Sequence, residues 1–177
     1  ALEAQAILDA YSEKMFALLR QTNFDLAMGE FLLDLSIGTA VMLVQPGDEV
    51  TPIRFTAVPQ YLVAIEEGAY GKVDNVYRRM RLKAEAITQH WTDADVGDRL
   101  QRIIDEKPTE EVELIEATMY DADAGTFSYC VIHPESQHRL LHRDMKSSPW
   151  IVARYTKVAG EIYGRGPLVT AIPDIKT

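Results

Sequence analysis

The sequence has only one cysteine, Cys130, among its 177 residues. No internal disulfide can form, which excludes a secreted scaffold held by disulfides and fits a reducing compartment. Basic residues are also scarce, since 18 Lys and Arg stand against 27 Asp and Glu and give a net charge of -9. Such an acidic chain is a poor candidate for a protein whose main task is to bind nucleic-acid phosphates. No Cys and His spacing matches a zinc site, and we expect no metal and no other cofactor.

Long hydrophobic runs are absent as well. The longest strongly apolar stretch, residues 38–44, is far shorter than the ~20 residues that span a bilayer, so we expect no membrane segment. Acidic residues interrupt the first 20 positions, which argues against a signal peptide. The chain begins at Ala1 and ends at Thr177, and we expect it to be an excised piece of a longer protein. The remaining composition, 47% apolar and 25% charged, is that of a globular protein able to bury a core.

Two helices are predicted at the start of the chain. The first covers residues 2–20, and the second begins after Thr22 or Asn23, either of which can cap it, and ends at Gly38. Each has an apolar stripe at helical spacing, and we expect both stripes to be core. The stripes consist of Ile7, Tyr11, Met15, Leu18 and Leu19 in the first helix and of Phe24, Met28, Phe31, Leu32 and Leu35 in the second.

Beyond Gly38 the pattern changes to short β-rich runs separated by turn residues. Two short helices, residues 83–91 and 96–105, interrupt the strands, and residues 121–125 form a hairpin loop with Gly125 at positive φ. The predicted order is ααββββααββββ followed by a tail, residues 168–177, in which a further helix can begin, although Pro173 limits its start. We expect one antiparallel α+β unit over residues 1–177, helical in 1–37 and β-rich in 38–177. The predicted strands are residues 39–45, 52–58, 61–66, 73–82, 111–120, 127–133, 139–143 and 150–155.

Few residues are candidates for chemistry. His138 and His142 are four apart, but the local pattern is strand or turn, where this spacing loses its helical meaning, and surface histidines are the simpler interpretation. Ser147 and Ser148 lack a nucleophile motif. Cys130 lies in an apolar strand, as buried thiols do. Acidic clusters at residues 66–67, 93–95 and 110–113 could pair for acid–base work, yet caps and solubilising charge explain them more simply.

The densest glycine stretch is residues 160–167, Gly-Glu-Ile-Tyr-Gly-Arg-Gly-Pro. A phosphate cradle needs glycines that open directly onto a helix N-terminus, and no Walker motif is present here. A shaped turn is therefore the favoured interpretation. The most basic stretch contains Arg78, Arg79, Arg81 and Lys83, and we expect its arginines on one side of a strand, facing solvent or a partner.

The same C-terminal stretch carries a family resemblance. Residues 148–167, from Ser-Pro-Trp through Arg154-Tyr155 to the glycine turn, followed by Ile-Pro-Asp-Ile-Lys at 172–176, resemble the head-to-tail connecting (portal) proteins of podoviruses. Residues 73–86 and the helix pair followed by Gly-Thr-Ala at 38–40 are also similar. The family-like positions that we single out are Trp150, Arg154, Tyr155, Gly160, Glu161, Tyr163, Gly164, Arg165, Gly166, Pro167, Pro173 and Asp174.

The resemblance implies a structural virion protein, without catalysis, of a tailed phage or prophage. It implies the peripheral wing of a longer portal subunit that forms a homo-oligomeric ring, a dodecamer, at one capsid vertex. The implied roles are DNA packaging, genome ejection and tail attachment, with DNA passing through without sequence-specific binding. The implied partners are capsid and scaffolding proteins, terminase and a tail adaptor, and assembly would take place in the host cytoplasm.

Two alternatives stay open at this point. One is another phage head–tail adaptor, which also forms rings. The other is a small α+β enzyme with a site at His138 and His142 or at the glycine loop.

Overall fold

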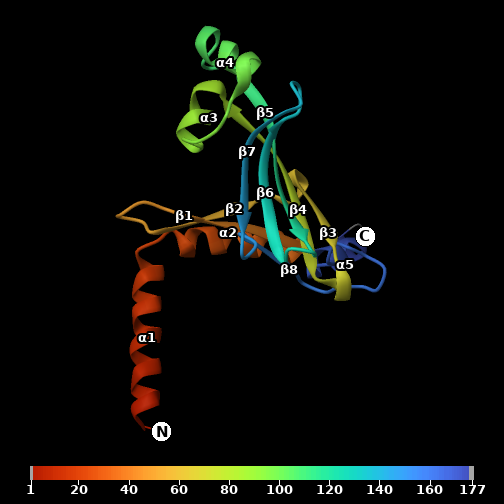
Figure 1. Ribbon diagram of the computed structural model, residues 1–177. Helices are drawn as coiled ribbons and strands as arrows, with labels where there is room; N and C mark the ends of the chain where they lie inside the picture. Colours follow the sequence, from red (N-terminus) through yellow and green to blue (C-terminus); the bar gives the residue numbers. More distant parts are fainter. Residues whose placement is uncertain (1, 176–177) are drawn as a thin grey trace. The chain divides into compact units, whose positions relative to one another are not determined.

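The computed structural model describes residues 2–175 and is shown in Figure 1. The predicted order of helices and strands is confirmed, and the tail contains a fifth helix. The helices are α1 (Leu2–Arg20), α2 (Phe24–Ile37), α3 (Ala84–His90), α4 (Gly97–Glu106) and α5 (Pro167–Ile175). The strands are β1 (Thr39–Pro46), β2 (Ile53–Val58), β3 (Val63–Glu67), β4 (Val73–Lys83), β5 (Glu111–Asp121), β6 (Thr126–His133), β7 (His138–Met145) and β8 (Trp150–Arg154).

The residues cluster into two compact units. The first contains the chain up to Gln60 together with the residues from Pro149 onward, and the second is Tyr61–Ser148. Each unit has its own antiparallel sheet, with strand order β2-β1-β8 in the first and β3-β4-β5-β6-β7 in the second. The expected α+β class is confirmed. No helix among the described residues combines the length and the apolar character needed to cross a membrane.

The core of the first unit lies between α2 and its sheet. Ala27 and Phe31 of α2 are buried against Ala40 and Met42 of β1 and Phe55 of β2. Burial of this face is what holds α2 on the sheet, because apolar area removed from water is worth about 25 cal/mol per Å². Phe24, Met28 and Leu35 pack against the same cluster as predicted, but Leu32 is 54% exposed, so its assignment to the core stripe is wrong.

The prediction that the stripe of α1 is core is also wrong. Every described side chain from Ala4 to Leu18 is exposed, and only Leu19 at the end of the helix packs against the core of the unit. Tyr11 and Met15, in the middle of the stripe, are 64% and 65% exposed. Helical periodicity defines which face of a helix is apolar, but it does not say what covers that face.

The turn between α1 and α2 is tied to the sheet by one side chain. Asn23 occupies the N-cap position of α2 but makes no capping bond. Its side-chain amide instead donates to the Phe55 carbonyl (2.6 Å) and accepts from the Phe55 N–H (3.0 Å). Asn23 thus pairs with edge strand β2 as a residue of a further strand would. The Thr22 hydroxyl accepts from the Phe24 N–H (3.2 Å), so Thr22 supplies the local bond at the start of α2.

We expect Asn23→Ala to lower the free energy of unfolding of the first unit by about 1–3 kcal/mol. The change leaves the Phe55 N–H and carbonyl without their partners in a part-buried position. Asn23→Asp should be intermediate, because a carboxylate still accepts from the N–H but cannot donate to the carbonyl. Urea unfolding followed by the fluorescence of Trp150 measures the effect, and Gln21→Ala in the same turn is the control. Equal stability of Asn23→Ala and Gln21→Ala would contradict the assigned role.

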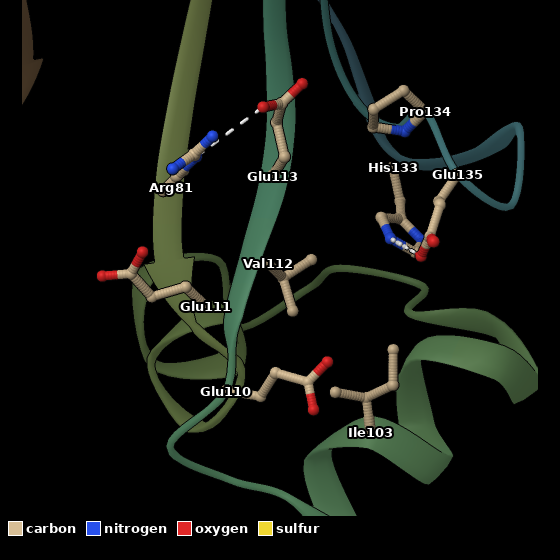
Figure 2. A pocket seen from close by; sticks show the side chains of 9 residues that line it. All are labelled: Arg81, Ile103, Glu110, Glu111, Val112, Glu113, His133, Pro134 and Glu135. Atoms are coloured by element: carbon tan, nitrogen blue, oxygen red, sulfur yellow. Dashed lines mark ion pairs between the residues drawn. The ribbon is translucent and has the colours of Figure 1, made fainter.

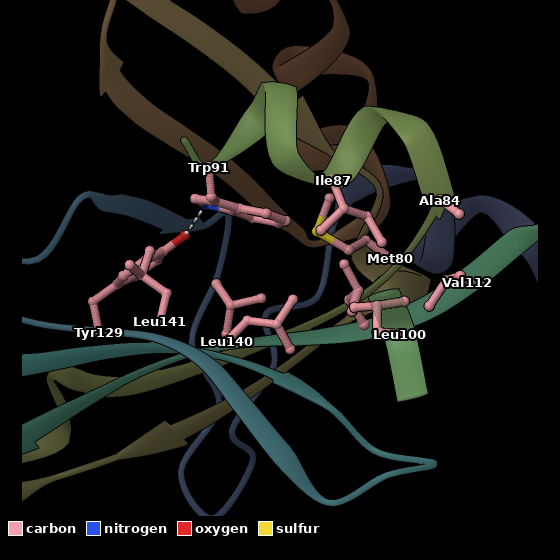
Figure 3. Close-up of a cluster of buried hydrophobic side chains, with 11 residues drawn as sticks. Met80, Ala84, Ile87, Trp91, Leu100, Val112, Tyr129, Leu140 and Leu141 are labelled. Carbon is pink, nitrogen blue, oxygen red and sulfur yellow. Dashed lines mark hydrogen bonds between the residues drawn. The ribbon is translucent and has the colours of Figure 1, made fainter. Parts of the chain in front are cut away.

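The second unit has its core between one face of its sheet and helices α3 and α4, which are inserted between β4 and β5. Figure 3 shows the side chains of this cluster. Alternation along the strands brings apolar residues to the covered face, and the short helices contribute their buried sides. The cluster consists of Met80, Ala84, Ile87, Trp91, Leu100, Val112, Leu114, Tyr129, Val131, Leu140 and Leu141.

The connection between α3 and α4 is fastened to the edge strand β7. The Asp95 N–H donates to the Leu140 carbonyl (2.8 Å). Arg143 of β7 donates to both carboxylate oxygens of Asp93, at 2.6 and 2.7 Å. This hydrogen-bonded ion pair lowers the pKa of Asp93, because the guanidinium favours the charged carboxylate. Asp93 and Asp95 belong to one of the acidic clusters seen in the sequence. In the structure they fasten the connection between α3 and α4 to β7.

Candidate functional site

The loop that follows β8, residues 155–166, is joined by hydrogen bonds to the junction of α2 and β1. The Tyr155 N–H donates to the Gly38 carbonyl (2.8 Å), and the Gly166 N–H donates to the Ile37 carbonyl (2.8 Å). Between them, the Gly164 N–H donates to the hydroxyl of the fully buried Thr39 (2.7 Å). The two segments are more than a hundred residues apart in the sequence. The glycine stretch and the Gly-Thr-Ala stretch, both part of the family resemblance, thus form one structure.

Three glycines make this close approach possible. A Cβ on Gly38 would lie 2.1 Å from the carbonyl oxygen of Gly164, and one on Gly166 would lie 2.1 Å from the carbonyl oxygen of Ser36. A Cβ on Gly164 would lie 2.4 Å from the carbonyl oxygen of Gly38. Each obstacle is backbone, which cannot rotate away as a side chain can. The glycines are needed here for contact between two backbones.

Gly164 does not have a positive φ, so a turn conformation is not what requires glycine at this position. The residue of this loop that does is Gly160, with φ of 83°, where nothing lies within 4 Å of an added Cβ. Turn geometry therefore accounts for Gly160 and close packing for Gly164. Gly125 in the β5–β6 hairpin has φ of 66°, as predicted.

Side chains hold the rest of the loop in shape. Arg165 and Glu161, four residues apart, form an ion pair in which the guanidinium Nε donates to the carboxylate at 2.9 Å. The pairing lowers the pKa of Glu161 and raises that of Arg165. Arg154, at the end of β8, donates to the Ile162 carbonyl (3.1 Å). Both arginines thus have partners within the loop.

The loop joins a strand to a helix, because α5 begins at Pro167. A phosphate cradle would need free backbone N–H groups at this point. The N–H groups of Gly164 and Gly166 are bonded as described above, and that of Arg165 donates to the Thr156 carbonyl (2.9 Å). With these donors already in use, the arrangement favours a shaped turn over a nucleotide site.

The other family-like positions flank this loop. Trp150 is buried at the start of β8, Tyr155 is exposed, and Tyr163 is half-buried. Pro173 and Asp174 lie within α5, and their side chains are outside the described part of the structure.

The two candidate histidines do not converge. In β7, Arg139 pairs with Ile132 and Leu141 with Val131, so Leu140 is an extra residue, a β-bulge, between His138 and His142. The Nε2 atom of His138 lies 2.9 Å from the Asp95 carbonyl oxygen, whereas that of His142 lies 2.9 Å from the Ser128 hydroxyl. Different partners and the intervening bulge separate the two rings, so they do not form a pair of metal ligands.

An acidic pocket of ≈ 590 Å³ lies at the start of β5 in the second unit (Figure 2). In Figure 2 the carboxylates of Glu110, Glu111 and Glu113 point in different directions, and Glu113 pairs loosely with Arg81 (3.7 Å). Burial lowers the pKa of His133 at the edge of this pocket, which favours a neutral ring. The carboxylates therefore lack the convergence that paired acid–base catalysis requires.

Other nucleophile candidates are equally unsuited to chemistry. Burial of the Cys130 side chain raises the pKa of its thiol, which disfavours the reactive thiolate. Ser147 and Ser148 lie in the bend between β7 and β8, as predicted. Among the described residues, no group of three or more His, Cys, Asp or Glu side chains is arranged to hold a metal ion.

The expectation that the arginines of β4 share one side is wrong. Alternation places Arg78 on the opposite face from Arg79 and Arg81. Arg78 forms an ion pair with Glu116 (3.4 Å), which is almost fully buried and also accepts a hydrogen bond of 2.6 Å from the Tyr129 hydroxyl. Glu116 was not among the predicted site residues, although its place two residues after Leu114 in a strand indicates a core-facing charge.

In the loop at residues 155–166, the backbone N–H groups of Tyr155, Gly164, Arg165 and Gly166 thus form hydrogen bonds that hold the loop in shape. In a comparison with known proteins, the model of the family "bacteriophage head to tail connecting protein" matches residues 1–177. The chain belongs to that family of structural phage components, and the resemblance noted in the sequence is confirmed. A search of curated proteins finds no match.

Proposed function

We propose that this chain is the wing part of a portal subunit, which assembles into a ring between phage head and tail. The observation that carries the proposal is the family match over the whole chain. A closed ring needs contacts between two unlike surfaces of each subunit. The first unit provides unlike exposed surfaces, since α1 shows an apolar stripe and α2 has exposed leucines on the side away from its core.

In this proposal the ring is a dodecamer at one vertex of the capsid, assembled in the host cytoplasm. It binds capsid and scaffolding proteins, the terminase that packages DNA, and a tail adaptor. DNA passes through the ring during packaging and ejection without sequence-specific contacts. The net charge of -9 supports this last point, because an acidic subunit does not retain a sliding polyanion.

Electron microscopy tests the proposal. The complete phage protein that contains residues 1–177, purified and negatively stained, should show rings with a central hole. Uniform compact particles without a hole, at concentrations that saturate assembly, would contradict it. Imaging of the native phage particle with an antibody against the second unit gives an independent result, and label at the head–tail junction is expected.

A further inference from the structure

Helix α2 is apolar on two opposite faces. One face carries Phe31 and packs on the sheet, whereas the opposite face carries Leu26, Gly29 and Leu33. Leu26 is 69% and Leu33 is 71% exposed. A helix that is apolar on all sides is normally buried on all sides. The rest of the described chain leaves Leu26 and Leu33 largely uncovered, and we call this second face the outer face of α2.

Nothing in the described part of the chain explains the glycine at position 29 on the outer face. A glycine inside a helix costs about 1 kcal/mol relative to alanine. It is tolerated where a neighbour comes too close for a side chain, as at Gly38 and Gly166, but nothing lies within 4 Å of a Cβ placed on Gly29. The glycine therefore leaves a shallow depression between two exposed leucines, and this depression suits a large side chain from another molecule.

The α1 stripe protrudes where the outer face of α2 has its depression, because the large side chains of Tyr11 and Met15 project from an exposed helix. Charge at the borders of the two surfaces is also opposite. Helical geometry places Lys14 beside the α1 stripe, while Glu30 borders the outer face of α2. Both of these charged side chains are exposed. The bonds of Thr22 and Asn23 fix the turn between the helices, which favours a partner for α1 outside its own chain.

We propose that the α1 stripe of one copy docks on the outer face of α2 of the next copy, with Tyr11 and Met15 over Gly29 and with Lys14 paired to Glu30. The inference rests on the proposed function and names the contact by which the ring closes. Two unlike surfaces on one unit give a head-to-tail contact that repeats around a ring. Two copies of α1 packed on each other would pair only two chains.

A crosslinking experiment distinguishes these arrangements. Two versions of the 177-residue chain, each with Cys130→Ala, carry Met15→Cys and Leu33→Cys respectively and are treated with a short bismaleimide, alone and mixed. We expect a dimer product from the mixture and little from either version alone. A product of the Met15→Cys chain alone would show α1 packed on α1 and overturn the proposal. The absence of any product in the mixture would overturn it as well. Val50→Cys, in the exposed β1–β2 turn, is the matched control partner.

Charge reversal gives a second, independent test. Lys14→Glu should weaken self-association of the chain about tenfold or more in sedimentation equilibrium, because a repulsion replaces an attraction. Glu30→Lys alone should do the same, and the double variant should restore most of the affinity. Additive losses without restoration would contradict the pairing.

A substitution at Gly29 distinguishes a shape-complementary contact from a non-specific apolar surface. Gly29→Leu should leave the fold intact, since its side chain meets open space, but should weaken association by filling the depression. Stronger association of Gly29→Leu would favour a non-specific apolar patch and overturn the proposal. Rings of the complete protein that persist in Lys14→Glu and Gly29→Leu would overturn this inference and leave the proposed function standing. The proposed function fails only if the unmodified protein forms no rings.

Discussion

Gly166→Ala should lower the free energy of unfolding of the first unit by about 3 kcal/mol or more, through overpacking and the loss of a buried hydrogen bond. The added methyl group would lie 2.1 Å from the Ser36 carbonyl oxygen and 2.5 Å from the Ile37 carbonyl carbon. Both atoms belong to the last turn of α2, a helix that packs on the sheet through its buried residues. Relief requires the loop to move away from α2, and that movement breaks the bond from the Gly166 N–H to Ile37.

The two tryptophans allow this effect to be measured in one unit. Trp150 lies in the first unit and Trp91 in the second, and both are buried. In a Trp91→Phe background, the fluorescence of Trp150 follows the first unit during urea unfolding. Gly29→Ala is the matched control: it makes the same chemical change in open space and should stabilise the isolated chain, because it improves helix propensity. If Gly166→Ala unfolded at the same urea concentration as the control, the close packing of the loop would not be essential.

The order of helices and strands could be predicted because it depends on local signals. Helical periodicity, the change to β-branched runs after Gly38 and the turn residues at 121–125 each act within a few positions. The glycines of residues 160–167 predict a shaped turn. The sequence does not predict that this turn meets the junction at Gly38 and Thr39, because no local pattern indicates which distant backbone a glycine is adapted to approach.

Other predictions were wrong because a sequence pattern does not show what a helix face or a side chain contacts in the folded protein. The α1 stripe was assigned to the core because amphipathic helices usually cover one, yet periodicity is the same for a helix that covers another molecule. Arg78 and Arg79 were grouped by their neighbourhood in sequence, although strand alternation separates neighbours onto opposite faces. Alternation alone is sufficient to separate these two arginines, and the register of β4 and β5 pairs Arg78 with Glu116. The bulge at Leu140 that divides His138 from His142 lacks any comparable signal.

The pair formed by Arg78 and Glu116 leads to the second large expected effect. Glu116 is 1% exposed, so its carboxylate depends on the Arg78 guanidinium and the Tyr129 hydroxyl in place of water. The Tyr129 hydroxyl in turn accepts a hydrogen bond from the Trp91 indole (3.3 Å). Burial and the neighbouring carboxylate raise the pKa of Tyr129, so this hydroxyl stays a donor. The polar group thus links β4, β5 and β6 to the residue that ends α3.

Arg78→Met should destabilise the second unit by about 3–5 kcal/mol, because it leaves the Glu116 carboxylate buried without its counter-charge. The double variant Arg78→Met with Glu116→Leu should recover most of that loss. Apolar residues of similar volume are often as good as a buried ion pair, and this pair is imperfect, since the Arg78 Nε is buried with no hydrogen-bond partner. Trp91 fluorescence during urea unfolding, in a Trp150→Phe background, gives the free energies of the double-mutant cycle.

Arg79→Met on the opposite face of β4 is the control for loss of a positive charge. Arg79 is exposed, so its replacement should change stability by less than about 0.5 kcal/mol. If the double variant were as unstable as Arg78→Met alone, the loss of stability would come mainly from lost packing of the aliphatic part of Arg78. The unpaired charge of Glu116 would then not be its main cause. Recovery in the double variant would instead show that the ion pair adds little net stability over an apolar core. The pair would then matter for the pairing register of β4 and β5, because a shift by one residue would carry Glu116 away from Arg78 and onto the opposite face.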